Sequence, residues 1–385
     1  MSQGRRNRGP SLDHASRFAS IPEPIGELVI GSTHPCPTLL ALLSTVKAAV
    51  YRRFGPPEVV RIEGVADPTP GDADVLIRVH ATTVTTADWR IRSKVMPSPI
   101  FRLIAPLVFG LRSPRKKVLG TECAGIIEAV GARVTKFTPG DRVVAAVGAR
   151  LGTHAEFVRV PESAAITRVP PNLTLEEAVA IPFGGLTALR YLRDVAGVGA
   201  GQRVLVVGAS GSVGVAAVQV ATHLGAAVTA VCSTANVERV RSLGAAVVLD
   251  RIATDFTRGT AMYDVVIDAV GATSFDKCRG VLAPRGQFLA VVMGLTELRQ
   301  ILWTKLVGGK RVRGAIVSET KADLEELMRL AAKGNIVPVI DRRVPFADIV
   351  EAHRRVDSGR KVGSVVVTIA DEPIPTTANR TVEES

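Results

Sequence analysis

The segment RVLVVGASGSVG, residues 203–214, constrains the fold of this chain more than any other part of it. Four consecutive apolar residues predict a buried strand, and residues 212–224 predict a helix directly after it. Ala209, Gly211 and Gly214 stand at the spacing of the GxGxxG motif, with alanine in the first place. Between a strand and a helix, this motif predicts a turn whose backbone N–H groups bind the diphosphate of a dinucleotide.

The residues expected to contact the diphosphate are those of the turn and of the first helical turn, namely Gly208, Ala209, Ser210, Gly211, Ser212, Val213 and Gly214. Glycine at position 211 lets the backbone approach the phosphates, and glycine at position 214 lets helix and strand pack closely. A tight turn between strand and helix that binds no ligand is the alternative.

The residues after the second strand of this unit bear on which dinucleotide binds. An NAD site usually places Asp or Glu about 20 residues downstream, where it holds the ribose hydroxyl groups. The strand at 227–232 is instead followed by Ser233, Thr234 and Asn236, and Arg251 follows the next strand. A carboxylate would repel a 2′-phosphate, whereas hydroxyl, amide and guanidinium groups accept one. We therefore expect NADP(H) to be preferred over NAD(H), with Arg251 as a solvated surface residue as the alternative.

Alternating strand and helix patterns over residues 171–309 predict an α/β unit with a doubly wound parallel sheet. Residues 46–170 differ, because short strands rich in Val and Ile are joined by turns such as Thr138–Asp141. Many short strands joined in this way predict a partly closed β-barrel. Residues 310–369 return to strand–helix–strand patterning, and residues 370–385 form a polar tail that we expect to be disordered.

Residues 1–45 show no sustained periodicity and begin with the basic segment MSQGRRNRGP. Three interpretations are open: a disordered extension, a basic organelle-targeting peptide, or a start assigned upstream of the true one. Residues 46–50 have the pattern of a first strand, and a valine codon can serve as a bacterial start. In each case we expect no fixed structure before about Thr45.

The net charge of +12 agrees with a basic surface that attracts anionic cofactors. Nucleic-acid binding is the sharper interpretation, but the sequence has no zinc knuckle, no helix-turn-helix signature and no basic run interleaved with aromatic residues. The four cysteines are widely and irregularly spaced, which predicts neither a zinc cage nor a disulfide framework and favours a reducing, cytoplasmic setting. No uninterrupted apolar run reaches the ~18 residues of a membrane span.

Several segments, in their order and spacing, resemble the zinc-independent quinone and enone reductases of the medium-chain dehydrogenase/reductase superfamily. The resemblance covers about residues 46–369 and rests on LGTECAGIIEAVG, FTPGDRVVA, HAEFVRVP, AIPFGGLTAL, GQRVLVVGASGSVG, SLGA, DVVIDAVG and GSVVV. It implies a Rossmann domain inserted in a GroES-like β-barrel substrate domain that both ends of the chain build. It also implies an active site in the cleft between these domains, and a homodimer.

The sequence departs from the zinc-dependent alcohol dehydrogenases of the same superfamily. Those enzymes carry a cysteine where this chain has Thr85, and a histidine where this chain has Thr121 before Glu122. A third ligand near Phe183 and the four-cysteine structural lobe are missing as well. Catalytic zinc needs three protein ligands, so the resemblance implies a reductase without a metal. A zinc-type alcohol dehydrogenase is the less favoured alternative.

The resemblance also implies further site residues. Thr85 matches an asparagine that hydrogen-bonds the nicotinamide or the substrate, so Thr85, together with Asp88 and His154, is a candidate for the catalytic chemistry. A structural histidine is the alternative for His154, and a helix-start hydroxyl for Thr187. Cofactor contacts are implied for Thr187, Val270, Gly271, Arg360 and Lys361.

These observations predict an NADPH-dependent oxidoreductase that transfers hydride to a quinone or to an α,β-unsaturated carbonyl compound. Residues 96–112 are apolar with interspersed arginines, and we interpret them as a lid, with a loop that touches a membrane as the alternative. An apolar small-molecule substrate follows from the lid. The alternative from a different class is an NADPH-binding protein with a non-catalytic role and an RNA or protein partner.

Overall fold

The computed structural model describes residues 45–96, 106–107 and 109–370 of the chain. Residues 44–385 form one compact unit, and everything described below belongs to it. The expectations for the N-terminal extension, for the C-terminal tail and for most of the lid segment therefore lie outside the described residues.

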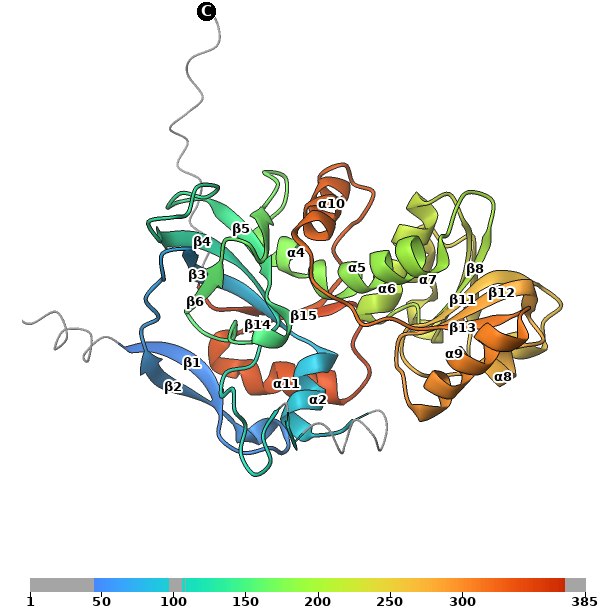
Figure 1. The fold of residues 1–385 in the computed structure, drawn as a ribbon, viewed down its shortest axis with the longest axis horizontal. Helices are drawn as coiled ribbons and strands as arrows, with labels where there is room; N and C mark the ends of the chain where they lie inside the picture. Colours follow the sequence, from blue (N-terminus) through green and yellow to red (C-terminus); the bar gives the residue numbers. More distant parts are fainter. Residues whose placement is uncertain (1–44, 97–105, 108, 371–385) are drawn as a thin grey trace, which may run out of the picture. The chain divides into compact units, whose positions relative to one another are not determined.

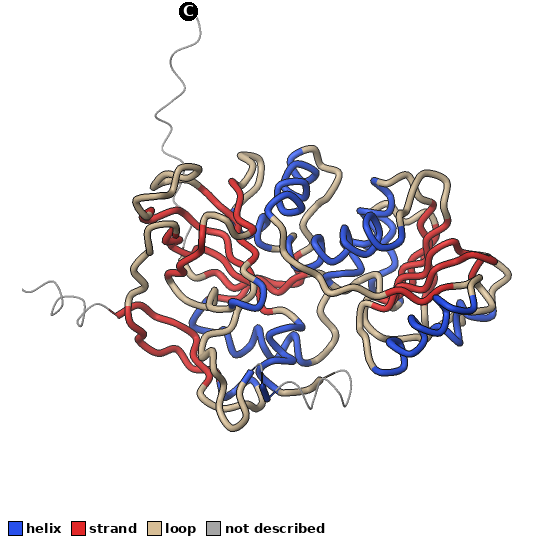
Figure 2. The backbone as a smooth tube through the Cα atoms, viewed as in Figure 1, coloured by secondary structure: helices blue, strands red, loops and turns tan. Residues whose placement is uncertain are grey.

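The residues predicted to alternate between strand and helix form a six-stranded parallel sheet (Figures 1 and 2). Its strands are β8 (Arg203–Val207), β9 (Ala227–Cys232), β10 (Val247–Asp250), β11 (Tyr263–Asp268), β12 (Leu282–Ala290) and β13 (Arg311–Arg313). The strand order is β10-β9-β8-β11-β12-β13, so the chain begins in the middle, builds one half outward and then crosses over to build the other. This is the doubly wound topology predicted from the sequence.

Helices precede, connect and follow these strands along the chain. They are α5 (Pro182–Leu189), the π-helical turn η3 (Arg190–Ala196), α6 (Ser212–His223), η4 (Thr234–Asn236), α7 (Val237–Ser242), η5 (Phe256–Arg258), α8 (Phe275–Cys278), α9 (Leu295–Val307) and α10 (Lys321–Ala332). The helix predicted at 212–224 is α6. It ends where Gly225 adopts a positive φ of 80°, which glycine allows without strain.

The apolar strands are buried on both faces of the parallel sheet. Val204 and Val206 of β8 pack in one cluster with residues of α5, α6 and α10, whereas Leu205 and Val207 pack in another with residues of α8. Because successive side chains of a strand point to opposite faces, an unbroken apolar strand needs helices on both sides. The valine-rich strands of the sequence therefore lead directly to the covered sheet.

Residues from both ends of the described chain form a seven-stranded mixed sheet. The sheet order is β14-β15-β3-β4-β5-β7, and β6 also pairs with β3. The strands are β3 (Asp74–Val84), β4 (Glu122–Val130), β5 (Arg142–Ala146), β6 (Phe157–Pro161), β7 (Ala165–Arg168), β14 (Ile340–Pro345) and β15 (Ser364–Thr368). A separate antiparallel pair consists of β1 (Thr45–Tyr51) and β2 (Val60–Ala66).

The antiparallel pairing of β15 with β3 brings the C-terminal strands into this second domain, as the resemblance implied. Its helical elements are η1 (Pro57–Val59), α2 (Thr86–Ser93), η2 (Gly148–Arg150), α4 (Leu175–Val179), η6 (Phe346–Asp348) and α11 (Ile349–Asp357). The parallel sheet is thus inserted between two parts of the sequence that fold together. We call the unit built on the parallel sheet the nucleotide domain, and the unit built on the seven-stranded mixed sheet the substrate domain.

Two short elements lie across the domain boundaries expected from the sequence. β13 pairs with β12 in the parallel sheet, although residues from 310 onward were expected to have left it. α4 packs against β3, β4, β5 and β15, although residues from 171 onward were expected in the nucleotide domain. Elements of three and five residues are too short to show a period, so only their packing assigns them to a domain.

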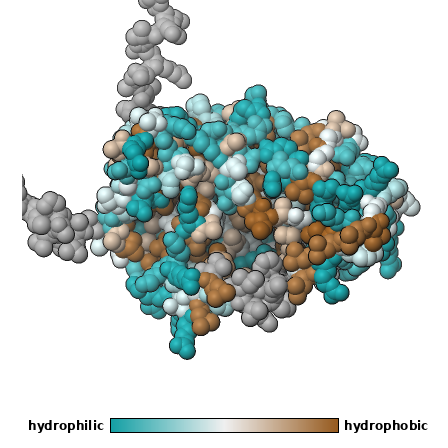
Figure 3. Space-filling model, in the orientation of Figure 1, coloured by the Kyte–Doolittle hydropathy of each residue, from teal (hydrophilic) through white to brown (hydrophobic). Residues whose placement is uncertain are grey.

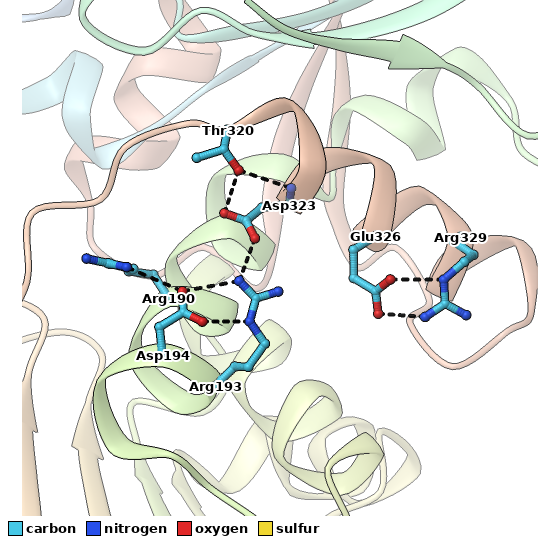
Figure 4. Close-up of polar contacts among 7 residues, drawn as sticks. All are labelled: Arg190, Arg193, Asp194, Thr320, Asp323, Glu326 and Arg329. Atoms are coloured by element: carbon cyan, nitrogen blue, oxygen red, sulfur yellow. Dashed lines mark hydrogen bonds and ion pairs between the residues drawn. The ribbon is translucent and has the colours of Figure 1, made fainter.

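An ion-pair network joins η3 to the start of α10 (Figure 4). Arg193 donates to Asp323 at 2.5 Å and to Asp194 at 2.7 Å, and the Thr320 hydroxyl donates to Asp323 at 2.7 Å. The side chain of Arg193 is 38% exposed, so the network adds little free energy. It sets the position of the chain that enters α10, and the residues just before that helix line a cavity described below.

A buried ion pair holds α2 against α11. The side chain of Arg92 is fully buried, and its Nη2 donates to both carboxylate oxygens of Asp357 at 2.6 Å. Its Nη1 donates to the Gly55 carbonyl oxygen at 2.8 Å. A guanidinium group in this environment depends on its carboxylate, because an unpaired buried charge is costly.

We predict that Asp357→Asn lowers the free energy of unfolding by roughly 3 kcal/mol, because it leaves Arg92 buried without a counter-charge. Urea denaturation followed by circular dichroism measures the change. Asp72→Asn is the matched control, since Asp72 meets Arg133 at 3.8 Å with both side chains more than 70% exposed. It should shift stability by less than about 0.5 kcal/mol. Equal stability of the Asp357 variant and the wild type would contradict the assignment.

Candidate active site

The glycine turn leaves the carboxyl end of β8 and opens α6. Gly208 has a positive φ of 77°, which glycine adopts without steric cost. A Cβ atom at Gly214 would lie 2.1 Å from the Gly208 carbonyl oxygen, so only glycine fits there. The first N–H groups of a helix have no acceptor within it. The turn therefore leaves these donors available to an anion, such as the dinucleotide diphosphate predicted from the sequence.

The turn is hydrogen-bonded to the segment that leads into β15. The Gly363 N–H donates to the Ser210 carbonyl oxygen at 2.8 Å, and the Ser212 hydroxyl donates to the Gly363 carbonyl oxygen at 2.7 Å. This contact places Lys361 beside the turn, where its Nζ donates to the Ser212 hydroxyl and to the Gly363 carbonyl oxygen. The substrate domain thus contributes a cation to the phosphate-binding turn.

A cavity of about 330 Å³ adjoins this turn, and we call it the nucleotide pocket. Gly211, Ser212, Val213 and Lys361 line it together with residues after β11 and β12 and at the end of α11. The remaining lining residues are Thr86, Trp89, Arg90, Phe183, Ala269, Val270, Val291, Val292, Val356, Asp357 and Gly359. Ligands of doubly wound sheets bind at the carboxyl ends of the strands, which is where this pocket lies.

A second cavity, of about 250 Å³, is lined in part by Phe183, which also lines the nucleotide pocket. We call it the apolar pocket, because most of its lining is aliphatic or aromatic: Ala87, Ile91, Phe109, Ala146, Leu151, Pro182, Leu186 and Val317. Its polar side chains are those of Thr121, Glu122, Thr187 and Glu319. A mostly apolar lining with a few polar groups is typical of a small-molecule site.

Glu122 is the buried acid of the apolar pocket. Its carboxyl group accepts hydrogen bonds from the Thr83 hydroxyl and from the Phe183 N–H. Burial raises the pKa of Glu122 to about 8, against the opposing effect of these hydrogen bonds. Burial also lowers the pKa of Lys361 to about 8, against the attraction of Asp341 and Glu122. At pH 7 the Glu122 carboxyl group is therefore mostly neutral and the Lys361 ammonium group mostly charged.

The residues expected at the adenosine ribose lie together at the carboxyl ends of β9 and β10. Asn236 donates to the Ser233 hydroxyl at 3.0 Å, and the Thr234 hydroxyl donates to Asp250 at 2.6 Å. Asp250 therefore brings a carboxylate to this edge, which the sequence did not reveal because Asp250 ends the third strand rather than the second. Arg251 follows it directly and is exposed.

None of the three residues predicted to be catalytic lines either cavity. The Thr85 hydroxyl donates to Asp88 at 2.7 Å in a capping box at the start of α2, and the Gly120 N–H donates to the other Asp88 oxygen at 2.8 Å. His154 is buried, with its Nε2 atom 2.9 Å from the Thr83 carbonyl oxygen. The side chains of Thr85, Asp88 and His154 therefore support the site through hydrogen bonds within the protein.

The other predicted cofactor residues are divided between the two cavities and the surface around them. Val270 lines the nucleotide pocket, and Thr187 lines the apolar pocket, where its hydroxyl donates to the Phe183 carbonyl oxygen at 2.9 Å. Gly271 and Arg360 line neither cavity. The Gly271 N–H is bound to the carboxylate at the end of β11, and Arg360 is exposed.

Sequence reasoning missed Arg90, Glu122 and Phe183 as residues that line the cavities. In the sequence, Glu122 stands out only as the carboxylate next to Thr121, and a single carboxylate does not make a zinc site. Arg90 lies four residues after Thr86, a spacing that puts both on one face of a helix. That signal was available in the sequence, but only the fold shows that this face of α2 borders the nucleotide pocket.

The described residues do not fit a catalytic zinc ion. Across residues 45–96, 106–107 and 109–370, no group of three or more His, Cys, Asp or Glu side chains is arranged to hold a metal ion. The apolar pocket offers two carboxyl groups and two hydroxyl groups, whereas zinc in this type of site takes three nitrogen, sulfur or carboxylate ligands.

In the same described ranges, no helix is long and apolar enough to span a lipid bilayer.

Two protein families match separate stretches of the chain. The family described as alcohol dehydrogenase GroES-like domain matches residues 71–171, and the family described as zinc-binding dehydrogenase matches residues 243–367. The mitochondrial NAD(P)H oxidoreductase RTN4IP1 from Mus musculus is 32% identical over 329 residues, which cover 77% of this chain and 82% of that protein. The chloroplast envelope quinone oxidoreductase homolog from Arabidopsis thaliana is 31% identical over 316 residues, covering 78% and 91%.

Solved structures share the fold. An NAD-dependent alcohol dehydrogenase superposes with a TM-score of 0.73 at 28% identity, covering 84% of this chain and 100% of that one. The quinone oxidoreductase from Coxiella burnetii gives a TM-score of 0.74 at 24% identity, covering 85% and 100%, a likeness of fold alone.

A doubly wound nucleotide domain inserted in a GroES-like substrate domain, with cavities lined by both, defines an NAD(P)-dependent oxidoreductase. The chain belongs to the medium-chain dehydrogenase/reductase superfamily, in its quinone oxidoreductase-like branch. The fold class and the resemblance stated from the sequence are both confirmed.

We predict that NADPH binds up to about tenfold more weakly at pH 9 than at pH 7, because Lys361, with a pKa of about 8, loses its charge in this interval. Isothermal titration calorimetry at several pH values measures the dissociation constant. The Lys361→Gln variant should bind NADPH more weakly than the wild type at pH 7 and should lose little further affinity between pH 7 and pH 9.

The control for this pH profile is Glu122→Gln, which removes the other group that titrates near pH 8. This variant should keep the slope of the wild type. A flat profile in the wild type, or a slope that disappears with Glu122 rather than with Lys361, would contradict the assignment of the charge to Lys361.

Proposed function

We propose that this protein is an NADPH-dependent reductase of quinones or α,β-unsaturated carbonyl compounds that works without a metal ion. One observation carries the proposal: an apolar, substrate-sized cavity adjoins the nucleotide pocket, and Phe183 lines both. Hydride transfer requires the cofactor and the acceptor to be held in contact in a site that excludes water. Two adjoining pockets of this kind provide that arrangement.

The protein's own residues supply binding, orientation and a proton. NADPH, when bound, supplies the hydride. The N–H groups of Ser212 and Val213 and the Lys361 ammonium group would hold its diphosphate. Thr121 lines the apolar pocket, and its hydroxyl is buried without a hydrogen-bond partner among the described residues, so we assign to it the role of donor to a carbonyl oxygen of the substrate. The Glu122 carboxyl group holds a proton below about pH 8.

We further propose that the protein prefers NADP(H) to NAD(H). Ser233 and Arg251 support it, because a hydroxyl group follows β9 and an exposed guanidinium group follows β10, and both kinds of group can bind a 2′-phosphate. Asp250 opposes it, although its carboxylate is already bound by the Thr234 hydroxyl and by the Ile252 N–H. We also propose a cytoplasmic location, because the irregular cysteine spacing favours a reducing setting. The relatives reported above include one mitochondrial protein and one of the chloroplast envelope.

The alternatives make different demands on the site. A zinc-type alcohol dehydrogenase needs a set of metal ligands that the described residues do not provide. An NADPH-binding protein with an RNA or protein partner would use the nucleotide pocket but would have no need of an adjoining apolar pocket. The apolar pocket therefore favours the reductase.

We predict that the purified protein oxidises NADPH with 2-cyclohexen-1-one or menadione, followed by the loss of NADPH absorbance, at a rate that chelators do not change. Thr121→Val should lower kcat/KM by about tenfold, the effect of one lost hydrogen bond to the substrate. Thr121→Ser is the matched control and should keep most of the activity. Absence of turnover together with tight, salt-sensitive RNA binding would instead support the non-catalytic alternative.

We also propose that the protein is a homodimer joined through β13 and α9. β13 is the last strand of the parallel sheet, so one of its edges is unpaired among the residues that the structure describes. Beside it, α9 exposes Leu302, Trp303, Leu306 and Val307, each at least 49% exposed. Figure 3 shows this apolar surface on the side of the molecule where α9 lies in Figure 1. A second copy would pair the open edge and cover the apolar side chains.

For this interface we predict that light scattering gives about twice the chain mass of 40.7 kDa for the wild type and that Leu306→Asp gives a monomer. A charge at a side chain that is 86% exposed in the single chain has no reason to disturb folding, but it would be buried in the dimer. Val247→Asp, at the opposite edge of the sheet, should leave the mass unchanged. A monomeric wild type would contradict the proposal.

A further inference from the structure

Arg90 is a cation without a partner in the described part of the chain. It lies on α2, two residues before Arg92, whose guanidinium group is bound by Asp357. Arg90 itself is half-buried. Burial lowers the pKa of its guanidinium group, and no neighbouring carboxylate opposes the shift. A guanidinium group keeps its charge at neutral pH in any case. A partly desolvated cation of this kind is suited to an anionic ligand.

Arg90 lines the same pocket as the glycine turn. Thr86, Trp89 and Arg90 all line the nucleotide pocket, and their spacing along α2 places them on one face of that helix. Ser212, at the start of α6, lines the same pocket. The substrate domain therefore presents a guanidinium group to the cavity into which the turn of the nucleotide domain opens.

The charges of the nucleotide pocket point to an anion there. Lys361 and Arg90 are its cationic side chains, and Asp357 is its one carboxylate among the described lining residues. Both oxygens of Asp357 accept hydrogen bonds from Arg92, which neutralises its charge. The two cations are therefore not matched by a free carboxylate in the pocket.

The anion is the diphosphate of the dinucleotide rather than its 2′-phosphate. The residues that would read a 2′-phosphate, Ser233 and Arg251, do not line this pocket, whereas the diphosphate-binding turn does. We propose that Arg90 donates hydrogen bonds from the substrate domain to the diphosphate held at the glycine turn. The inference rests on the proposed binding of NADPH and names a residue of the substrate domain that recognises it.

This role has a consequence for the enzyme as a whole. The turn at Gly211 belongs to the nucleotide domain, whereas Arg90 and Lys361 belong to the substrate domain. A diphosphate held by all three would bridge the domains, and the dinucleotide would stabilise the arrangement in which the two pockets adjoin. Binding of the cofactor and assembly of the site would then be coupled through one ligand group.

The experiment compares two ligands that each contain one of the two anionic groups. ADP-ribose contains the diphosphate and no 2′-phosphate, whereas adenosine 2′-phosphate contains the reverse. Arg90→Gln should weaken ADP-ribose and NADPH by about tenfold, since a charge-assisted hydrogen bond is worth about 1.5 kcal/mol or more. It should leave adenosine 2′-phosphate within about twofold of the wild type, by the same conversion. Calorimetry measures each dissociation constant, and Arg90→Lys should restore part of the loss.

Arg251→Gln is the matched variant and should show the opposite pattern, with weaker adenosine 2′-phosphate and unchanged ADP-ribose. Unchanged binding of adenosine 2′-phosphate also shows that Arg90→Gln is folded, and Arg90→Met serves if the first variant is not. Wild-type affinity of Arg90→Gln for ADP-ribose, or equal losses for both ligands, would overturn the role of Arg90. A wild type that binds neither NADPH nor ADP-ribose would overturn the proposed function itself, and this inference with it.

Discussion

The contact between the glycine turn and Gly363 is the interaction on which the rest of the site depends. The Gly363 N–H and carbonyl oxygen each bond to the turn, through Ser210 and Ser212. A Cβ atom at Gly363 would lie 2.0 Å from the Val339 carbonyl oxygen, and its φ of 68° suits glycine. Glycine at position 363 therefore lets the segment before β15 pass close to Val339. The two hydrogen bonds fix this segment of the substrate domain against the glycine turn.

The electrostatics of the site follow from this close approach. Lys361 lies two residues before Gly363 and is buried beside the turn, so that its charge is held by the Ser212 hydroxyl and by a carbonyl oxygen. Glu122 is buried on the neighbouring side, in the apolar pocket. Burial moves the pKa values of the acid and the base toward each other, to about 8 in both cases. In the proposed mechanism, Lys361 would offer its positive charge to a diphosphate, and Glu122 would offer a proton to a substrate.

The fold was predictable because its signals are local. An unbroken apolar strand, a glycine turn and a helix follow one another at residues 203–223, and the same order of elements repeats downstream. The site was only partly predictable. Ser212, Val270 and Lys361 were expected near the cofactor and do line the nucleotide pocket. Thr85 was expected to reach a ligand, but its hydroxyl is used within its own capping box, and a motif does not reveal which hydrogen bonds its side chain has already made.

The sequence by itself determined the doubly wound sheet, the phosphate-binding turn and the superfamily, because spacing along the chain encodes each of them. Only the tertiary structure decided what surrounds that turn. Arg90 and Lys361 are separated from it by more than a hundred residues in opposite directions, and Asp250 reaches the adenosine edge through strand pairing. Charge, burial and hydrogen-bond partners are properties of neighbours in space. They arise when β15 pairs with β3 and returns the end of the chain to the turn.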